Sequence, residues 1–361
     1  MTRAALRAAA ACAALGLAGL GGCTTLHYYG QAIGGELRVL HRRRPIAKVL
    51  ADPATKPAVR RKLRLVLAAR RFASTELHLP RGDSYTTYVA LDRAYPVWVV
   101  YATREFSLTP RRWCFPFAGC VPYRGYFHEA AARRFAAERR KRGDDVFVTG
   151  APAYSTLGWF ADPVYSSMLR WGKVELAGTI FHELAHQKLY VEGDAPFNES
   201  FADTVEALGV QRLFSRRDPA ALARWHVLQR AQRAVAGYAA TARRRLEGVY
   251  RSRAAPAQKR REKGAVFDWL RIQYRALEVR TGVQYSQRWL AGLNNAGLVL
   301  LGTYDAWTGA FRRLFACGGG RFSRFYAAAA RLAHMPPKAR HARLQALSAG
   351  KCPGNGKGAS L

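Results

Sequence analysis

The residues with the clearest chemical potential lie at 182–186, which read His-Glu-Leu-Ala-His. Two histidines four residues apart project from one face of a helix, so their neutral imidazoles can occupy two positions of a tetrahedral Zn²⁺ site. Glu183 lies beside the pair, where its carboxylate can reach a metal-activated water rather than the metal. The pattern predicts a helix over 173–190 that carries two zinc ligands, His182 and His186, and a general base.

A hydrolytic zinc site needs a third protein ligand and keeps its fourth position open for water. Glu199 follows His186 after twelve intervening residues and opens a second expected helix, 198–214. A turn containing Gly, Asp and Pro at 193–196 would fold this helix back on the first. Two imidazoles and one carboxylate suit Zn²⁺, and a non-haem iron site does not usually take the helical His-Glu-x-x-His form. Glu199 is therefore the predicted third ligand.

Two further acids follow on the second helix. Asp203 lies four residues after Glu199 on the same face, where it can accept the outer N–H of a zinc-bound histidine, and Glu206 is the alternative for that role. The alternative is a non-enzymatic lipoprotein in which the zinc site is structural and a basic surface binds polymers of the cell envelope. Such sites are usually closed by four protein ligands, and Glu183 would have no use in one, so the sequence favours hydrolysis.

The elements that must position these residues indicate an α+β fold. Two or three helices are expected within 31–72, and strands within 85–91 and 97–103, which we expect to pair with each other. Another strand is expected from Asp144, with a possible extension to Thr156. Besides the helix that carries the two histidines, helices are expected at 128–142, 198–214, 219–247, 258–280, 285–313 with breaks, 321–332 and 337–348. The sequence thus predicts a small antiparallel or mixed sheet followed by a helical second half.

The N-terminus has the features of an export signal. Arg3 and Arg7 precede an uncharged run, 8–20, that is too short to span a bilayer. The run ends in Leu-Gly-Gly-Cys, which resembles the bacterial lipoprotein box. The resemblance implies cleavage after residue 22, acylation of Cys23 and, with Thr24 next, an outer-membrane anchor facing the periplasm. An ordinary signal with an incidental cysteine is the alternative.

Charge is the most unusual bulk property of the chain. It contains 58 Lys and Arg against 24 Asp and Glu, a formal net charge of +34, which becomes +32 when the two arginines of the signal are removed. Its 49% hydrophobic content excludes a disordered polycation. For an exported protein, nucleic acid is not an expected partner, whereas phospholipid headgroups and anionic cell-wall polymers are. Compositional bias is the alternative interpretation.

Four cysteines remain once Cys12 leaves with the signal and Cys23 carries lipid. Four cysteines allow three pairings, and an oxidising periplasm favours their formation. Cys114 with Cys120 would close a local loop, and Cys317 with Cys352 would then fix the C-terminal tail. Free or exchanged thiols are the alternative.

Two motifs carry a resemblance to a known family. His-Glu-Leu-Ala-His-Gln at 182–187, followed by Asn-Glu-Ser-Phe-Ala at 198–202, resembles the gluzincin metallopeptidases, particularly the zinc aminopeptidases, although the interval is shorter here. Nearly the whole mature chain is similar to a family of predicted bacterial lipoprotein aminopeptidases. The shared features are the lipoprotein box, 113–127, 153–163, 179–187, 193–202 and 293–296.

The resemblance implies a single zincin-like catalytic domain over 23–361, with the zinc site in its helical part from about 171. It also implies a zinc-dependent peptidase of the cell envelope, most simply an aminopeptidase, and assigns strand 146–157 to substrate binding. Zinc endopeptidase action on envelope proteins or cell-wall peptides stays open, because the segment that grips the substrate α-ammonium in large aminopeptidases is absent. Glu129, Glu175 and Asp162 are candidate substitutes.

The mechanism also needs a group that stabilises the tetrahedral oxyanion. Such a donor is often Tyr or His. Tyr154, on the expected edge strand, and Tyr304, late in the helical region, are the two candidates, and the sequence does not choose between them.

Overall fold

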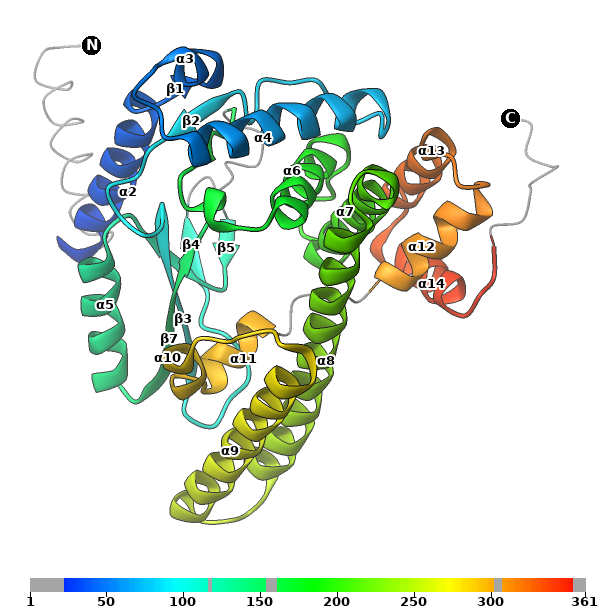
Figure 1. The fold of residues 1–361 in the computed structure, drawn as a ribbon. Helices are drawn as coiled ribbons and strands as arrows, with labels where there is room; N and C mark the ends of the chain where they lie inside the picture. Colours follow the sequence, from blue (N-terminus) through cyan, green and yellow to red (C-terminus); the bar gives the residue numbers. More distant parts are fainter. Residues whose placement is uncertain (1–22, 116–118, 154–160, 302–306, 353–361) are drawn as a thin grey trace, which may run out of the picture.

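The computed structural model describes residues 23–115, 119–153, 161–301 and 307–352 (Figure 1). They form a mixed α+β fold with small sheets in the first half and helices in the second, as the sequence predicts. In the described part of the chain, no helix is long and apolar enough to cross a membrane.

The largest sheet is three-stranded and antiparallel, in the order β6-β3-β7. A second sheet has the order β1-β2-β8, in which β1 and β2 are antiparallel and β2 and β8 are parallel, and β4 and β5 form a separate hairpin. The strands are β1 (Arg44–Pro45), β2 (Thr87–Val89), β3 (Val97–Arg104), β4 (Trp113–Phe115), β5 (Gly119–Val121), β6 (Arg124–Tyr126), β7 (Asp144–Ala151) and β8 (Val164–Tyr165).

The expected pairing of strands 85–91 and 97–103 is wrong. Both segments contain strands, but β2 pairs with β1 and β8, whereas β3 pairs with β6 and β7. Tyr85, just before β2, has a left-handed φ of 62° and donates its backbone N–H to the Asp162 carbonyl at 2.6 Å. This hydrogen bond links the start of β2 to the residues just before β8. The strand propensity of a short segment does not indicate which distant segment it pairs with.

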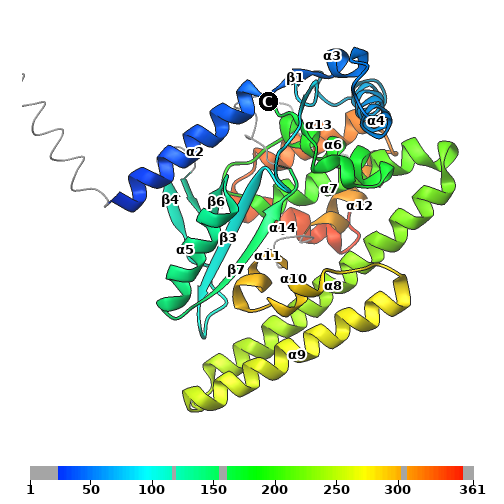
Figure 2. The ribbon, with the colours of Figure 1, turned by 60° about the vertical axis from the view of Figure 1, so that its left-hand side comes forward.

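Helices cover both faces of the largest sheet (Figure 2). Helix α5 (Glu129–Lys141) packs on the face formed by Val100, Ala102 and Val146, and α11 (Asn295–Leu301) packs on the opposite face beside Phe147. Residues 100 and 102 of β3 share a face because side chains alternate along a strand. The sheet is therefore buried on both sides.

The helices of the second half agree closely with the expected ones. The expected break-up of 285–313 appears as three separate helices, and α8 and α9 form a long antiparallel hairpin that projects from the body (Figure 1). The helices of this half are α6 (Lys173–Lys188), α7 (Ala195–Arg217), α8 (Pro219–Arg251), α9 (Pro256–Thr281), α10 (Gln287–Ala291), α11, α12 (Thr308–Cys317), α13 (Phe322–Ala333) and α14 (Pro337–Ser348).

Three helices, as allowed for, occupy the N-terminal region: α2 (Cys23–His41), α3 (Ile46–Ala51) and α4 (Pro57–Thr75). Helix α4 packs against α6, so apolar residues of the first half complete the core around the zinc-motif helix. Leu63 and Val66 of α4 and Phe181 of α6 are fully buried in this core. Cys23 lies in the first turn of α2, and its side chain is outside the described part of the structure.

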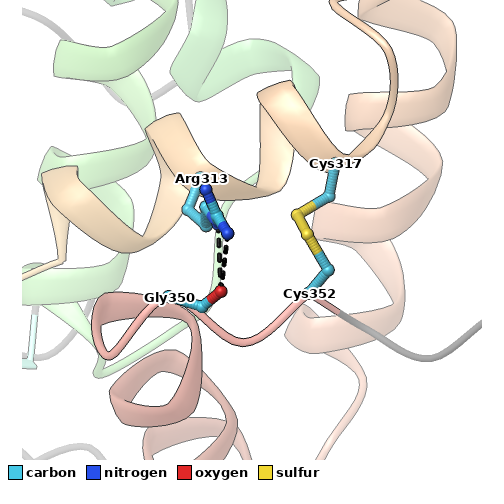
Figure 3. The surroundings of a disulfide bond; sticks show 4 residues. All are labelled: Arg313, Cys317, Gly350 and Cys352. Carbon is cyan, nitrogen blue, oxygen red and sulfur yellow. Dashed lines mark hydrogen bonds between the residues drawn. A yellow bond between two sulfur atoms is a disulfide. The ribbon is translucent and has the colours of Figure 1, made fainter.

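Both expected disulfides are present. Cys114 and Cys120 face each other across the β4–β5 hairpin. Cys317, at the end of α12, is bonded to Cys352, and Arg313 of α12 donates to the Gly350 carbonyl at 2.7 Å beside this bond (Figure 3). We call α12, α13 and α14 the C-terminal unit. The Cys317–Cys352 disulfide joins the end of α12 to the segment that follows α14.

The two disulfides predict different losses of stability. Cross-linking reduces the entropy of the unfolded chain more when the closed loop is longer, and the sequence separations are 35 and 6 residues. We expect Cys317→Ser with Cys352→Ser to lower the free energy of unfolding by about 4 kcal/mol, and Cys114→Ser with Cys120→Ser by about 2 kcal/mol. Urea titration of both double variants checks this; equal losses would contradict the loop-length argument.

Candidate metal centre

The two histidines of the zinc motif lie on α6, whose remaining faces are held in the core. Val174, Leu176, Ile180, Phe181 and Leu184 are buried. The His182 and His186 side chains are 15% and 12% exposed, so they reach a partly open surface from a rigid helix. Their ring centroids are 4.8 Å apart. A four-residue interval on one face produces this approach directly.

Glu199 reaches the same surface because α7 folds back against α6. Asp194 caps α7 by accepting the Phe197 N–H, and Pro196 is in the first turn. Helix α7 therefore begins at Ala195, earlier than the expected start at Asn198, and Glu199 lies in its second turn instead of opening it. The buried Asn198 amide bonds both the N–H and the carbonyl of Val191 at 2.8 Å. These local bonds fix the turn that brings Glu199 to the histidines.

The three predicted ligands converge at distances that fit Zn²⁺. The His182 Nε2 and His186 Nε2 atoms are 3.1 Å apart, and the Glu199 carboxylate oxygens lie 3.4 Å from the first and 3.7 Å from the second. Ligand bonds of about 2.1 Å in a tetrahedron separate neighbouring ligand atoms by about 3.4 Å. The side chains are thus preorganised around a position that a small tetrahedral cation fits.

The opposite nitrogen of His182 faces the two acids expected to orient it. Its Nδ1 atom is 3.2 Å from Asp203 and 3.5 Å from Glu206. Burial acts to lower the pKa of His182, but hydrogen bonds to Asp203, Glu199 and Glu206 outweigh it and hold that pKa well above its ordinary value. The acids therefore favour positive charge at this position. Both fit the orienting role that the sequence left open between them.

Burial shifts the pKa values of His186 and Glu183 in opposite directions. It lowers the pKa of His186 to about 4, with a contribution from His182, so this imidazole is neutral, the form that ligates metals. Burial is also the main cause that raises the pKa of Glu183 to about 6; the carboxylates of Asp162, Glu199 and Glu206 add to the rise, and His182 opposes it. A carboxyl group with a pKa near neutrality suits a general base.

Two tyrosines that were not among the candidates predicted from the sequence lie beside the centre. The Tyr190 ring meets the His186 ring edge to face at a centroid distance of 6.4 Å. Burial and then the nearby Tyr190 and Glu199 raise the pKa of Tyr123, which belongs to the segment between β5 and β6. Tyr123 follows Cys120 by three residues, but nothing in that spacing indicates a place at the centre. Tyr154 and Tyr304 are outside the described residues.

A family model described as "Putative aminopeptidase" matches residues 27–344, which is most of the chain. The chain belongs to this aminopeptidase family. Membership supports peptidase activity. Searches of curated proteins and of solved structures each found no match.

Polar groups of Gln187, Ser84 and Asp162 lie beside Glu183. Gln187, one turn later on α6, donates to the Ser84 hydroxyl at 2.8 Å, and that hydroxyl is also 3.2 Å from the Asp162 backbone nitrogen. Asp162 is 2% exposed, and its charge acts on Glu183. Of the three candidate α-ammonium ligands, Asp162 is the one whose charge contributes to the raised pKa of Glu183. Glu129 instead pairs with Arg133 on α5, and Glu175 is in the first turn of α6.

The strand expected to bind substrate is an edge strand. Among the described strands, β7 pairs on one side only, with β3. Asn294 donates to the Val146 carbonyl at 3.1 Å, so the start of this edge is covered. The strand ends at Ala151, residues 152–153 do not continue it, and the rest of the expected strand, from 154, is outside the described residues.

The C-terminal unit anchors the turn that precedes Glu199. Arg340 of α14 is 4% exposed and donates from Nε to the Asp194 carboxylate at 2.8 Å, while His341 Nε2 lies 3.0 Å from the same oxygen. Arg340 also donates to the carbonyls of Ala333 and Met335. The buried charges of Asp194 and Arg340 therefore neutralise each other. Their ion pair joins the N-cap of α7 to a residue of α14 that lies 146 positions later in the chain.

This anchor predicts acid sensitivity. Burial acts to raise the pKa of Asp194, but hydrogen bonds from His341, the Phe197 N–H and Arg340 outweigh it and lower that pKa. A carboxyl group whose pKa is lower in the folded chain stabilises the fold above its unfolded pKa, and this stability is lost as pH falls through the folded pKa. We expect the free energy of unfolding to drop below about pH 4, less steeply in Asp194→Asn. Urea titrations between pH 7 and 3 measure this; equal slopes would contradict it.

Proposed function

We propose that the chain is a zinc-dependent aminopeptidase whose metal is held by His182, His186 and Glu199. The convergence of their three ligand groups at 3.1–3.7 Å is the observation that carries this proposal. The acids behind His182 support it further, because they supply negative charge to orient and compensate a metal-bound imidazole.

The residues around this position can perform peptide hydrolysis. Zn²⁺, when bound, would supply a Lewis acid that lowers the pKa of water and polarises the scissile carbonyl. Glu183 accepts the proton of the attacking water and later donates it to the leaving amine. Tyr123 and Tyr190 are two described tyrosines beside the centre whose hydroxyl groups can donate to the developing oxyanion.

The arrangement also supports a gluzincin assignment and a zincin-like fold. In this proposal one helix supplies the histidines and the base, the next supplies the glutamate, and β7 is the edge along which substrate adds as an antiparallel strand. Residues 23–361 would then form one catalytic domain after a 22-residue signal, which limited proteolysis of the mature protein would test by yielding one resistant core.

Removal of the metal tests the central claim. We expect 1,10-phenanthroline to abolish release of p-nitroaniline from aminoacyl-p-nitroanilides, and one equivalent of Zn²⁺ per chain to restore it. Activity should be lost because Zn²⁺ is the Lewis acid of the proposed reaction, and its three ligands cannot take over that role. Undiminished activity of protein shown by metal analysis to be zinc-free would overturn the zinc assignment.

The same assay distinguishes exopeptidase from endopeptidase action. An aminopeptidase must bind the free α-ammonium of its substrate, so N-acetylation should stop release of p-nitroaniline. Asp162 is the described candidate for this contact. Equal rates on free and acetylated substrates would favour an endopeptidase of envelope proteins or cell-wall peptides.

The proposed location is the periplasmic face of the outer membrane, through a lipid on Cys23. The Leu-Gly-Gly-Cys sequence supports this, and the two disulfides agree with an oxidising compartment. Mass spectrometry of the mature N-terminal peptide should detect an acylated Cys23. An unmodified peptide that begins elsewhere would contradict the anchor.

A further inference from the structure

Basic side chains gather at the turn between α8 and α9. Residues 243–263 contain nine Lys or Arg and two Glu. Arg251, Arg253 and Arg261 are exposed, and no described carboxylate pairs with them, in contrast to the neighbouring Arg260, which pairs with Glu105. A cluster that the chain itself leaves unneutralised produces a positive potential available to an anionic partner.

A second basic cluster lies at the end of α5. Arg140, Lys141 and Arg142 are consecutive and exposed. The preceding Arg139 differs, because it is turned inward to the buried Asp144 and forms an ion pair there. Arg140 also donates to the Val146 carbonyl at 3.3 Å, and all three side chains add to the charge of the surface.

Both clusters lie along one edge of the molecule, together with the first turn of α2. In Figure 1 and in the rotated view of Figure 2, the start of α2, the end of α5 and the α8–α9 turn follow one another along the same outline, with the rest of the protein to one side. Helices α6 and α7, which carry the metal centre, lie away from this outline in both views. We call residues 140–142, 251, 253 and 261 the basic edge.

Helix α2 is fixed to the body rather than loosely tethered. Gln31 accepts the Phe127 N–H at 3.0 Å, and Val39 is 2% exposed. A side chain at Gly35 would collide with the Phe127 ring, since a Cβ there would lie 2.1 Å from it. These contacts hold α2 from Gln31 onward against the body, and the start of the helix lies along the same outline as the basic edge in both views.

We propose that the basic edge docks on the anionic headgroups of a phospholipid bilayer. The position of α2 favours a bilayer over a cell-wall polymer, because the residue proposed to carry lipid is at the same edge. This docking goes beyond the proposed peptidase activity and does not require it. It would orient the body, with the basic edge on the membrane and the metal centre away from it.

The test uses the mature chain with Cys23→Ala, so that no lipid contributes to binding. We expect it to sediment with vesicles of phosphatidylcholine and phosphatidylglycerol but not with phosphatidylcholine alone, and to be released by added NaCl. Arg251→Gln, Arg253→Gln and Arg261→Gln together should weaken binding about 100-fold, because each charge near the surface contributes roughly fivefold.

A matched control lies at the other end of α8. Arg216, Arg217 and Arg224 are also exposed and lie about 40–50 Å from the α8–α9 turn, by the rise per residue of the 33-residue α8. Their replacement by Gln removes the same charge and should leave vesicle binding unchanged, while both triple variants keep the aminopeptidase rate. Equal loss in the two triple variants would overturn the proposal in favour of diffuse charge. Binding to isolated cell-wall polymer but not to anionic vesicles would overturn it as well.

Discussion

Glu183→Gln is expected to lower kcat by about 10²–10⁴-fold while one equivalent of zinc stays bound per chain. The amide occupies nearly the same volume but cannot accept the proton of the attacking water. Because Glu183 is not among the converging ligand groups, its replacement should leave His182, His186 and Glu199 in place. Stopped assays on an aminoacyl-p-nitroanilide, with metal analysis of the same preparation, measure both quantities.

Glu192→Gln is the matched control for this variant. Glu192 is exposed in the turn between α6 and α7, so it shares the neighbourhood of the centre without the burial of Glu183. Its replacement should change kcat less than twofold, as for an ordinary surface substitution. Near wild-type turnover by Glu183→Gln would refute the general-base assignment, and loss of zinc would show that Glu183 helps to hold the metal.

Arg340→Met is expected to lower the free energy of unfolding by about 3 kcal/mol. It removes one partner of a buried ion pair and leaves the Asp194 charge with His341 and the Phe197 N–H alone. The N-cap of α7 is then less firmly held, so we also expect weaker zinc binding through Glu199. Urea titration of the zinc-free protein and chelator competition for zinc measure the two effects separately.

Arg343→Met provides the comparison on the same helix. Arg343 is only partly buried, and no ion pair of the described residues includes it, so its replacement should change stability by less than about 0.5 kcal/mol. A loss of stability in Arg340→Met with unchanged zinc affinity would show that the C-terminal unit supports the fold but does not position Glu199.

Much of the centre followed from local sequence. A four-residue interval between histidines defines one helical face whatever the surrounding fold, and that is why the placement of His182 and His186 was predictable. The helix boundaries of the second half were predictable for a related reason, since Pro, Gly and Asp mark helix ends through backbone chemistry confined to a few residues. The pairing of four cysteines was limited to three choices, and the structure contains the predicted one.

Contacts between distant segments were not predictable in the same way. The partners of β2 and β3 depend on where the chain returns after about 75 and 45 residues, respectively, and similar strand propensities fit several pairings. Tyr123 reaches the centre only because the segment after the β4–β5 hairpin lies near Tyr190 and Glu199, whereas the contact of Tyr190 with His186 spans only four residues. The Asp194–Arg340 pair joins segments that share no motif.

The sequence alone predicts which side chains can bind a metal, which one can act as the base, which acids can orient His182 and which helices carry them, because these depend on intervals of a few residues. It does not predict that Tyr123 and Asp162 lie near that centre, how the C-terminal unit holds the turn before Glu199, or which edge collects unpaired positive charge. The physical reason is that burial, ion pairing and electrostatic potential depend on distances in space, and a linear chain leaves those distances open until its core packs.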